Sequence, residues 1–497
     1  PSQIEIIWGS VNRNLWLKSL PPLLCRAKRS GRRQCSGARG VEIRMAKDGE
    51  KWSWSTYTYQ VVIVGAGFLA DAYDLFVIDL VISILNRLHP GGLGPSEKSL
   101  IASSTLLGAI FGQLLFGVLG DWVGRRWTFL VTCVLIVVGA TLSGCVVWVE
   151  DPSSAFGLVR QLALCRFVLG IGVGGEYPLA AAIAAEGAPS GSRGRLIAAV
   201  FSMQGWGMLL SCLLVLLLLA VGAPLEWIWR IVLIFGAVPS AAVIFIRSSM
   251  EETDRFKETH QEGTASFRSH VSTAVGHIKN YWRPLVGTTM TWLLLDVTFY
   301  GTGSFKHRVS SSLDPGRHMG DPREEVWQEA VFATLCSCLA IPGYLLTVAF
   351  VEVLGRFNIQ LWGFVAMAVN FFAVALMSST GTGSRWLMFL CFGLTFLFSN
   401  FGPNTTTFML PAEVYPTAVR TTCHGLSAAA GKLGAVIGVV AFSPCEAAFG
   451  IEAVLAACGI VCLSGALFTL GFTPRDSAED LRELDGLLPE VNKAERS

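Results

Sequence analysis

The chain has 497 residues, of which 52% are hydrophobic and only 15% are charged, and its mean hydropathy is +0.53. In soluble domains about a quarter of the residues are charged, so most of this protein's surface does not face water. The formal net charge of +2 gives no indication of a nucleic-acid partner. The thirteen cysteines form no Cys-x-x-Cys pair, and most lie within apolar runs, which favours packing roles over metal ligation.

The chain before Met45 reads differently from the rest. Residues 26–44 are rich in Arg, Ser and Gly and poor in acidic residues, and a plausible start, Met45-Ala-Lys-Asp-Gly-Glu, follows immediately. We therefore expect residues 1–44 to be a disordered extension that is either non-native or a targeting peptide.

Apolar runs of about 20 residues, separated by short polar clusters, dominate the chain after Met45. This length matches the thickness of a bilayer, so each run predicts a spanning helix. The expected spans are 57–83, 98–119, 127–149, 158–183, 194–221, 227–247, 284–304, 327–351, 358–378, 385–409, 418–442 and 450–472. The sequence thus predicts an all-α membrane protein of twelve transmembrane helices in two pseudo-symmetric six-helix bundles.

The domain organisation follows from the polar stretch between the two sets of spans. The expected parts are an N-terminal bundle at 45–247, a cytoplasmic linker at 248–283, a C-terminal bundle at 284–472 and a cytoplasmic tail at 473–497. Positively charged residues gather in the even-numbered loops, on the same side as Lys47 and Lys51. The positively charged residues of these even-numbered loops are Arg125, Arg126, Arg193, Arg195, Arg247, Arg255, Arg356 and Arg420. Because positive loops stay in the cytoplasm, both termini are expected there.

Charged residues of the first half recur in the second half at a nearly constant separation along the chain, which indicates an internal repeat. The second span ends in Gly117-x-x-x-Asp121-x-x-Gly124-Arg-Arg, and the eighth ends in Glu352-x-x-Gly355-Arg. We expect a cytoplasmic gate in which acids cap helix N-termini or pair with arginines, and which does not bind substrate. Its predicted members are Asp121, Arg125, Arg126, Glu186, Arg193, Glu352, Arg356, Glu413 and Arg420. Charge clusters that merely stabilise loops are the alternative.

Acidic residues inside the first span are the next signal. An ionisable group within a membrane is costly unless it is paired, hydrated or functional. Asp71 and Asp74 share a helix face, where two close carboxylates cannot easily both be ionised, so one is expected to carry a proton. Asp79 is a further candidate. The alternative is that these acids lie at a helix end near the headgroups.

The fourth and fifth spans contribute further polar residues. A glycine-rich run from Gly170 leads to Glu176, Tyr177 and Pro178, and Gln204 follows in the fifth span. No strand precedes the glycines and no Gly-Lys-Ser/Thr follows, so they are interpreted as helix-packing positions and not as a nucleotide loop. A kink at Pro178 would turn freed backbone groups toward a cavity.

The second half carries a matching set. Trp292, Asp296 and Tyr300 fall on one helical stripe, Asn404 follows a helix-breaking Gly-Pro, and Lys432 is a lone cation in an apolar span. A Trp or Asn alone would more often be a packing residue. The convergence of acid, lysine, amides and tyrosines in a membrane interior instead favours a binding site.

Donor side chains dominate this set, which favours a small anion rich in acceptor oxygens. They are Tyr177, Gln204, Trp292, Tyr300, Asn404 and Lys432. The acceptor Asp296 suits an anion that carries its own protons, as dihydrogen phosphate does and sulfate does not. Asp296 would therefore select phosphate over sulfate. A sugar would also accept the mixture but has no obvious need of a buried lysine.

The gate motif at Gly117 resembles that of the major facilitator superfamily, and Glu413-Val-Tyr-Pro-Thr-Ala-Val-Arg420 looks like its sugar-porter branch. Over most of 57–442 the chain resembles the phosphate:proton symporters of fungi, plants and protists. The motifs that carry this resemblance are Asp71/Asp74, Gly175-Glu176-Tyr177-Pro178-Leu179, Met203-Gln204-Gly205, Trp292/Asp296/Tyr300, Phe401-Gly-Pro-Asn404-Thr-Thr-Thr and Gly431-Lys432.

The resemblance implies a role for each of these residues. The implied phosphate-binding residues are Tyr177, Gln204, Trp292, Asp296, Tyr300 and Asn404, with Lys432 holding the charge. The implied proton-coupling residues are Asp71, Asp74, Glu176 and Asp296. Two positions depart from the family pattern. Glu176 replaces the usual Asp, which would move its carboxylate toward Lys432 or the cavity, and the segment at 248–256 lacks the family's prolines.

The expected function is the import of phosphate with at least one proton, by alternating access of a midplane site. We expect no enzyme activity and no cofactor, a lipid bilayer as surroundings, no nucleic-acid partner, a monomer, and residence in the plasma membrane. Two alternatives stay open. One is proton-coupled transport of a glycerophosphodiester, an organic anion or a sugar, and the other is a receptor that senses phosphate without moving it.

Overall fold

The structure is a computed structural model that describes residues 54–89, 93–147, 157–188, 190–248, 252, 256, 267–303, 321–382 and 384–475. The expected extension at 1–44 lies outside these residues. So do most of the stretch from 249 to 266 and the tail beyond residue 475.

Helices are the only regular elements in the described ranges, so the prediction of an all-α protein is confirmed. The earlier ones are α2 (Trp54–Leu88), α3 (Pro95–Trp122), α4 (Arg125–Gly144), α5 (Leu158–Gly187), η2 (Ser190–Ser192), α6 (Arg193–Ala220), α7 (Leu225–Phe235) and α8 (Ala237–Ser248). The later ones are α10 (Phe267–Asn280), α11 (Trp282–Gly303), α13 (Pro322–Leu354), α14 (Arg356–Thr380), α15 (Arg385–Asn400), α16 (Pro403–Val414), α17 (Arg420–Phe449) and α18 (Ile451–Phe472).

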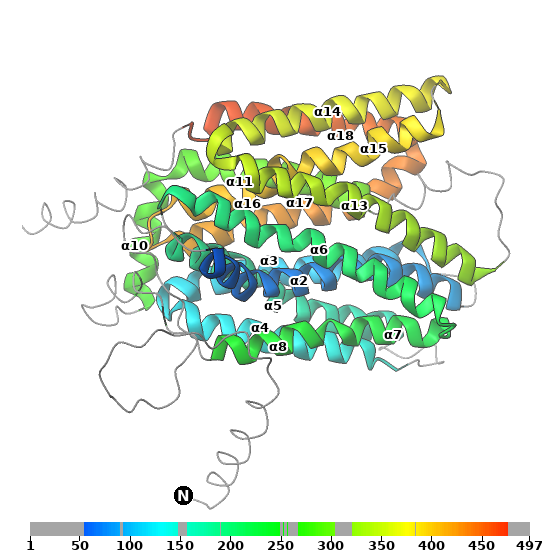
Figure 1. Ribbon diagram of the computed structural model, residues 1–497, viewed down its shortest axis with the longest axis horizontal. Coiled ribbons are helices and arrows are strands. Elements are labelled where there is room, and N and C mark those ends of the chain that lie inside the picture. The colour runs from blue at the N-terminus through cyan, green and yellow to red at the C-terminus, as the bar shows by residue number, and fades with distance from the viewer. Residues whose placement is uncertain are drawn as a thin grey trace, which may run out of the picture. The chain divides into compact units, whose positions relative to one another are not determined.

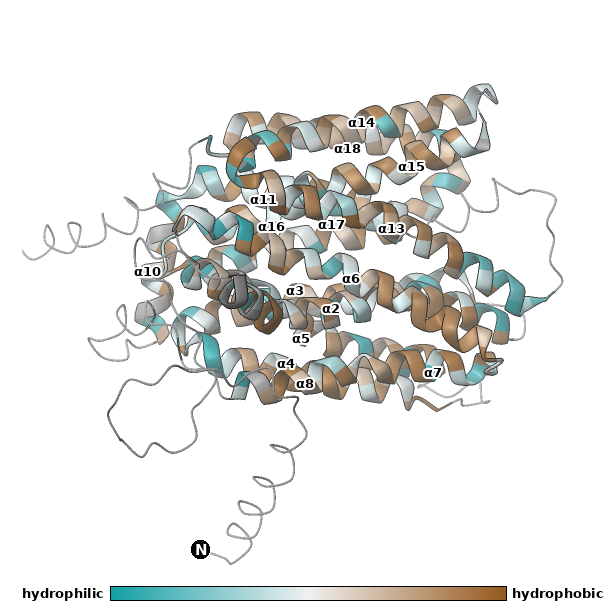
Figure 2. Ribbon diagram, in the orientation of Figure 1, coloured by the Kyte–Doolittle hydropathy of each residue, from teal (hydrophilic) through white to brown (hydrophobic). Residues whose placement is uncertain are grey.

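Within the described residues, 11 helical segments are long and apolar enough to cross a bilayer. The pair α7 and α8 makes one of these segments, and α15 and α16 make another, interrupted at Phe401 and Gly402 as the Gly-Pro sequence predicted. Figure 2 shows the apolar residues that dominate the long helix α14 and the consecutive shorter helices α7 and α8. The segment α11 matches the span expected at 284–304, but its threonines and Asp296 make it too polar for this criterion.

Helices from the two halves of the chain pack closely against each other. A Cβ added at Gly425 of α17 would lie 2.3 Å from the carbonyl oxygen of Gln113 on α3. Likewise, a Cβ added at Gly117 of α3 would lie 2.8 Å from the carbonyl oxygen of Thr421 on α17. Such distances mean that α3 and α17 touch backbone to backbone, as small residues allow between membrane helices. The helices α6 and α13 form another broad contact between the halves.

The helix α10 lies across one end of the long helices, which run side by side (Figure 1). Its residues Ala274 and Ile278 pack against Tyr415 and Val419, at the junction of α16 and α17. The part of the expected linker that the structure describes therefore includes a helix that covers this end.

Candidate functional site

The predicted gate residues meet at the end of the bundle where α10 lies. Asp121 at the end of α3 accepts hydrogen bonds from the backbone N–H groups of Thr421 (3.3 Å) and Thr422 (2.8 Å) and from the Thr422 hydroxyl (2.8 Å). A carboxylate is stabilised at a helix N-terminus, where the amide groups and the helix dipole face it. Asp121 thus caps α17 and joins the two halves of the chain.

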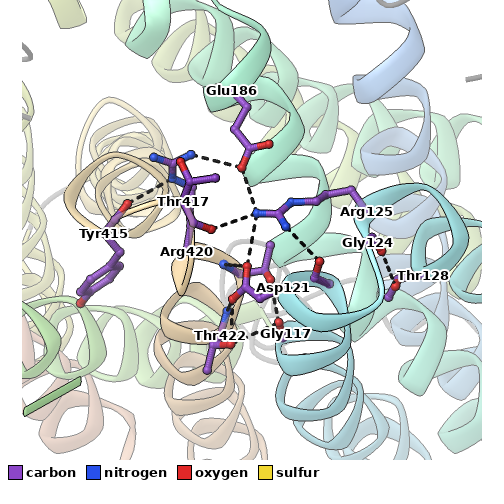
Figure 3. A network of polar contacts seen from close by, with 12 residues as sticks. Gly117, Asp121, Gly124, Arg125, Thr128, Glu186, Tyr415, Thr417, Arg420 and Thr422 are labelled. Atoms are coloured by element: carbon purple, nitrogen blue, oxygen red, sulfur yellow. Dashed lines mark hydrogen bonds and ion pairs between the residues drawn. The ribbon is translucent and has the colours of Figure 1, made fainter. Parts of the chain in front are cut away.

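Arg125 extends this network (Figure 3). Its Nη2 donates to Asp121 (3.3 Å), to Glu186 (3.1 Å) and to the carbonyl oxygen of Thr417 (3.0 Å). Arg420 donates to the same Glu186 oxygen at 3.2 Å. We call Asp121, Arg125, Glu186 and Arg420 the first latch. Because all four side chains are buried, water does not screen their charges.

A second latch repeats this arrangement in the other half. Arg356 pairs with Glu413 through two bonds of 2.9 and 2.8 Å and with Glu352 at 2.8 Å. Glu352 also accepts the backbone N–H of Arg195 at the start of α6 (3.0 Å), so the second latch crosses between halves as well. Of the other predicted gate residues, Arg126 donates to the carbonyl oxygen of Ser248 at 3.0 Å. Arg193 is buried at the first position of α6.

Five of the predicted binding residues lie together in the membrane interior. Lys432 Nζ on α17 donates to Asp296 Oδ2 at 3.0 Å and to Tyr300 Oη at 2.9 Å. It also lies 5.3 Å from the ring centre of Tyr177, whose ring is 6.4 Å from that of Trp292. We call these residues the central cluster. It combines one cation, one carboxylate and two phenols in a buried space, which is suited to a small oxygen-rich anion that carries a proton.

The two remaining predicted binding residues lie on the side formed by α6, α13 and α16. Asn404 donates to Tyr344 Oη at 3.1 Å and to Asn400 Oδ1 at 2.7 Å. Gln204 is buried, and its neighbour Gly205 packs against the Tyr344 ring. Among the described residues, neither amide forms a hydrogen bond with the central cluster. Tyr344 was not identified from the sequence, because a lone tyrosine in an apolar span resembles a packing residue.

A layer of buried aromatic rings separates the polar interior from the latches. Phe201 stacks on Phe408 with ring centres 4.6 Å apart, and Phe68 lies 4.9 Å from both Phe408 and Tyr177. Trp292 approaches Phe408 at 6.5 Å. These rings come from α2, α6, α11 and α16, which belong to both halves. Sequence reasoning missed this layer because phenylalanine is common in every span.

Asp74 turns toward a cation on a neighbouring helix. Arg166 of α5 lies with its Nη1 3.9 Å from Asp74 Oδ1, and it also donates to the Asp74 carbonyl oxygen and to the Thr105 hydroxyl (3.2 Å). All of these groups are buried. Asp74 therefore belongs to an ion pair between α2 and α5, whereas Lys432 pairs with Asp296.

Glu176 does not point where the sequence predicted. Its carboxylate is held by both terminal nitrogens of Arg247, one of them at 2.8 Å, and not by Lys432. The sequence analysis counted Arg247, at the end of a span, among the loop charges, but in the structure it lies in the last turn of α8 with its guanidinium buried in the bundle. Asp71 and Asp74 both have carboxylate oxygens that are buried without a hydrogen-bond partner within the described part of the protein. They differ in that Arg166 lies within ion-pair distance of Asp74, whereas Asp71 forms no ion pair among these residues.

A small cavity of about 20 Å³, enough for a water molecule, lies on the other side of the central cluster from the aromatic layer. Its walls include Phe76, Asp79, Thr105, Met208, Phe299 and Tyr300. Because Tyr300 belongs both to this cavity and to the central cluster, the cavity leads to the cluster from the end opposite the latches.

A further group of ion pairs, missed from the sequence, joins the halves at that opposite end. Arg87 at the end of α2 binds Glu325 (3.0 Å) and Glu329 (2.6 Å) in the first turns of α13, and Ser83 also bonds Glu329. Arg323 donates to the Ala223 carbonyl oxygen at the end of α6 (2.9 Å). We call Arg87, Glu325 and Glu329 the outer clamp. Glu325 and Glu329 are four residues apart and therefore share a helix face, which could have suggested a paired site. The sequence does not reveal that their partner is Arg87.

Comparison with known proteins agrees with this architecture. A family model described as "Sugar (and other) transporter" matches residues 59–295 and 324–488. A probable inorganic phosphate transporter 1-7 of Arabidopsis thaliana is 35% identical, over 90% of this chain and 95% of its own length. An inorganic phosphate transporter 1-1 of Oryza sativa subsp. japonica is 37% identical, over 81% of this chain and 86% of its own.

Solved structures show the same fold. The major facilitator superfamily proton:xylose symporter XylE, bound to 6-bromo-6-deoxy-D-glucose, superposes with a TM-score of 0.71 at 20% identity, over 87% of this chain and 99% of that one. The inward open xylose transporter XylE from E. coli gives 0.62 at 18% identity, over 87% and 99%. The prediction of a multi-pass transporter, and not an enzyme, is confirmed. The chain belongs to the sugar (and other) transporter family of the major facilitator superfamily and, within it, to the group of the plant inorganic phosphate transporters.

Proposed function

We propose that this chain imports inorganic phosphate together with protons, by alternating access of one central site to the two sides of the membrane. The observation that carries the proposal is the central cluster, in which Lys432 is bonded to both Asp296 and Tyr300. The lysine would balance the charge of phosphate, and Asp296 would accept a hydrogen bond from a protonated phosphate oxygen. The names of the plant relatives support phosphate as the substrate.

Access to this site differs at its two ends. The small cavity beside Tyr300 would have to widen to admit phosphate, whereas the aromatic layer and both latches close the other end. Inward release then requires the contacts of Asp121 with α17 and of Glu352 with α6 to separate. Phosphate binding would favour this rearrangement only if phosphate binds the inward-facing arrangement more tightly than the arrangement seen here.

The proton would travel on an interior carboxyl group. Three of the four predicted coupling acids are paired with cations, namely Asp74 with Arg166, Glu176 with Arg247 and Asp296 with Lys432. Asp71 has no such partner in the described residues. Because an unpaired buried carboxylate is costly, Asp71 is the proposed carrier, and protonation removes its charge when the site is loaded.

The remaining features of the proposal concern topology. The latches and both termini are assigned to the cytoplasm on the distribution of positive charge, with α11 as the twelfth span. The plasma membrane is the proposed location, a monomer is the proposed functional unit, and the two six-helix sets are proposed to be separate bundles that rock against each other.

The proposal is tested by labelled phosphate uptake into proteoliposomes with and without an imposed proton gradient. Wild-type uptake should rise with an inward gradient and fall to the basal rate with an uncoupler, and Asp296→Asn should not transport. Unlabelled phosphate should compete, whereas glycerophosphodiesters and sugars should not. Uptake that ignores the proton gradient would refute symport, and competition by a sugar alone would refute phosphate as the substrate.

The outer clamp gives a separate prediction about gating. Arg87→Gln would leave Glu325 and Glu329 without their shared cation, so closure at this end should weaken. Because these side chains are partly exposed, we expect a decrease in phosphate uptake of about three- to tenfold and not a complete loss. The exchange Arg87→Glu with Glu329→Arg should restore most of the rate. An exchange variant that is no better than Arg87→Gln would show that the pairing itself does not matter.

A further inference from the structure

Arg247 is an interior cation that the distribution of charge in the sequence placed in a loop. Only 1% of its side chain is exposed, and both terminal nitrogens bind the Glu176 carboxylate. Its guanidinium lies 3.4 Å from the ring centre of Phe129 and 2.9 Å from Cys133 Sγ, both on α4. The pair is therefore fixed between three helices, α4, α5 and α8.

The Glu176–Arg247 pair lies directly against α2, beside Asp71. A Cβ added at Gly67 would lie 1.9 Å from Glu176 Oε1 and 2.2 Å from Arg247 Nη2, so the backbone of α2 touches the pair. Asp71 follows one helical turn later and interacts electrostatically with both residues. The other charged or titratable groups that act on Asp71 are Asp74 on its own helix, Cys133 on α4 and Tyr177 on α5. Asp74 has its own cation in Arg166.

The group formed by Asp71, Glu176 and Arg247 contains two carboxyl groups but only one guanidinium. A guanidinium that binds a carboxylate through two bonds stabilises its ionised form strongly. We propose that Arg247 is a positioning residue that keeps Glu176 a permanent anion, so that within this group Asp71 alone exchanges the transported proton. This inference rests on the proposed proton symport. It also explains why a glutamate serves at position 176, because the longer side chain reaches the cation at the end of α8.

The charge count predicts a different result for each variant. Glu176→Gln leaves Arg247 beside Asp71 alone, so Asp71 should stay ionised and uptake should lose its dependence on the proton gradient. Arg247→Gln leaves two carboxyl groups without a cation, so both should retain protons and gradient-driven uptake should fall about tenfold or more. Phosphate exchange, which needs no proton release, should continue in Arg247→Gln. The double variant Glu176→Gln/Arg247→Gln again has one carboxyl group, so gradient-driven uptake should return to within about threefold of wild type.

The experiment uses the full-length chain in proteoliposomes and measures two rates for each variant. These are net phosphate uptake driven by an imposed proton gradient, and exchange of labelled for unlabelled phosphate without a gradient. Recovery of gradient-driven uptake in the double variant supports the inference when Arg247→Gln itself keeps phosphate exchange, because a variant that had only lost stability would lose exchange as well.

A double variant that exchanges phosphate but stays uncoupled would overturn the inference, and so would a Glu176→Gln variant that keeps wild-type coupling. Should Arg247→Gln fail to fold, Glu176→Gln alone still decides between these results. A wild-type uptake rate that does not depend on the proton gradient would instead refute the proposed symport, and with it the role of Arg247. The wild-type measurement thus tests the proposed function, and the comparison of variants tests the inference.

Discussion

Replacing Lys432 with glutamine is expected to abolish phosphate uptake. Lys432 is the cation of the central cluster, and its removal leaves Asp296 buried without a counter-charge. Breaking a buried ion pair in this way costs about 3–5 kcal/mol, which corresponds to a loss of at least about 100-fold in a binding or rate constant. The lost attraction for phosphate adds to this effect. The measurement is initial-rate uptake of labelled phosphate in proteoliposomes, normalised to the amount of folded protein.

Two further variants separate this effect from general damage. Lys279→Gln removes an exposed lysine from α10 and should transport at the wild-type rate. The double variant Lys432→Met with Asp296→Asn removes both charges, so it should recover thermal stability but not transport. Uptake by Lys432→Gln within about threefold of wild type would show that the central cluster is not the phosphate site.

Replacing Asp121 with alanine is expected to open the latch end of the transporter. Asp121 accepts three hydrogen bonds from the first turn of α17 and pairs with Arg125, so one substitution removes the cap of α17 and one acid of the first latch. Buried donors left without acceptors cost about 1–3 kcal/mol each. The equilibrium should shift toward the inward-facing state, and uptake should fall by about 10- to 100-fold.

A native cysteine reports this opening. Cys423 lies in the first turn of α17 and is fully buried, so a small thiol reagent should modify it only in the Asp121→Ala protein. Cys145 is exposed just beyond the end of α4 and should react equally in both proteins. Asp121→Asn keeps one acceptor oxygen and should give an intermediate result. Unchanged modification of Cys423 together with normal uptake would mean that the first latch does not hold this end closed.

The interior acids differ in their surroundings more than in their sequence. Asp71 and Asp74 are three residues apart, yet Asp74 faces Arg166 whereas Asp71 faces a pair that is already neutral as a unit. The sequence predicted that one acid of the two would carry a proton, but it offered no basis for choosing between them. The choice depends on which helix face meets which neighbouring helix, and hydropathy does not encode the rotation of a helix about its axis.

The sequence by itself determined the membrane class, the positions of the spans and the five residues of the central cluster. These are local properties. A run of about 20 apolar residues predicts a span without reference to its neighbours, and a charged residue within it is rare enough to indicate function. The recurrence of Asp121 and Arg125 as Glu352 and Arg356 likewise required only spacing along the chain.

Only the tertiary structure decided how the charges are paired. Arg247 and Glu176 are separated by 71 positions, and Arg87 and Glu329 by 242, so neither pair could be recognised from spacing. The aromatic layer of Phe68, Phe201, Trp292 and Phe408 likewise exists only where four helices meet. The physical reason is that an ion pair or a ring contact between helices depends on their tilt, rotation and depth in the membrane. Those quantities are set by the packing of all the helices together, and no single span contains them.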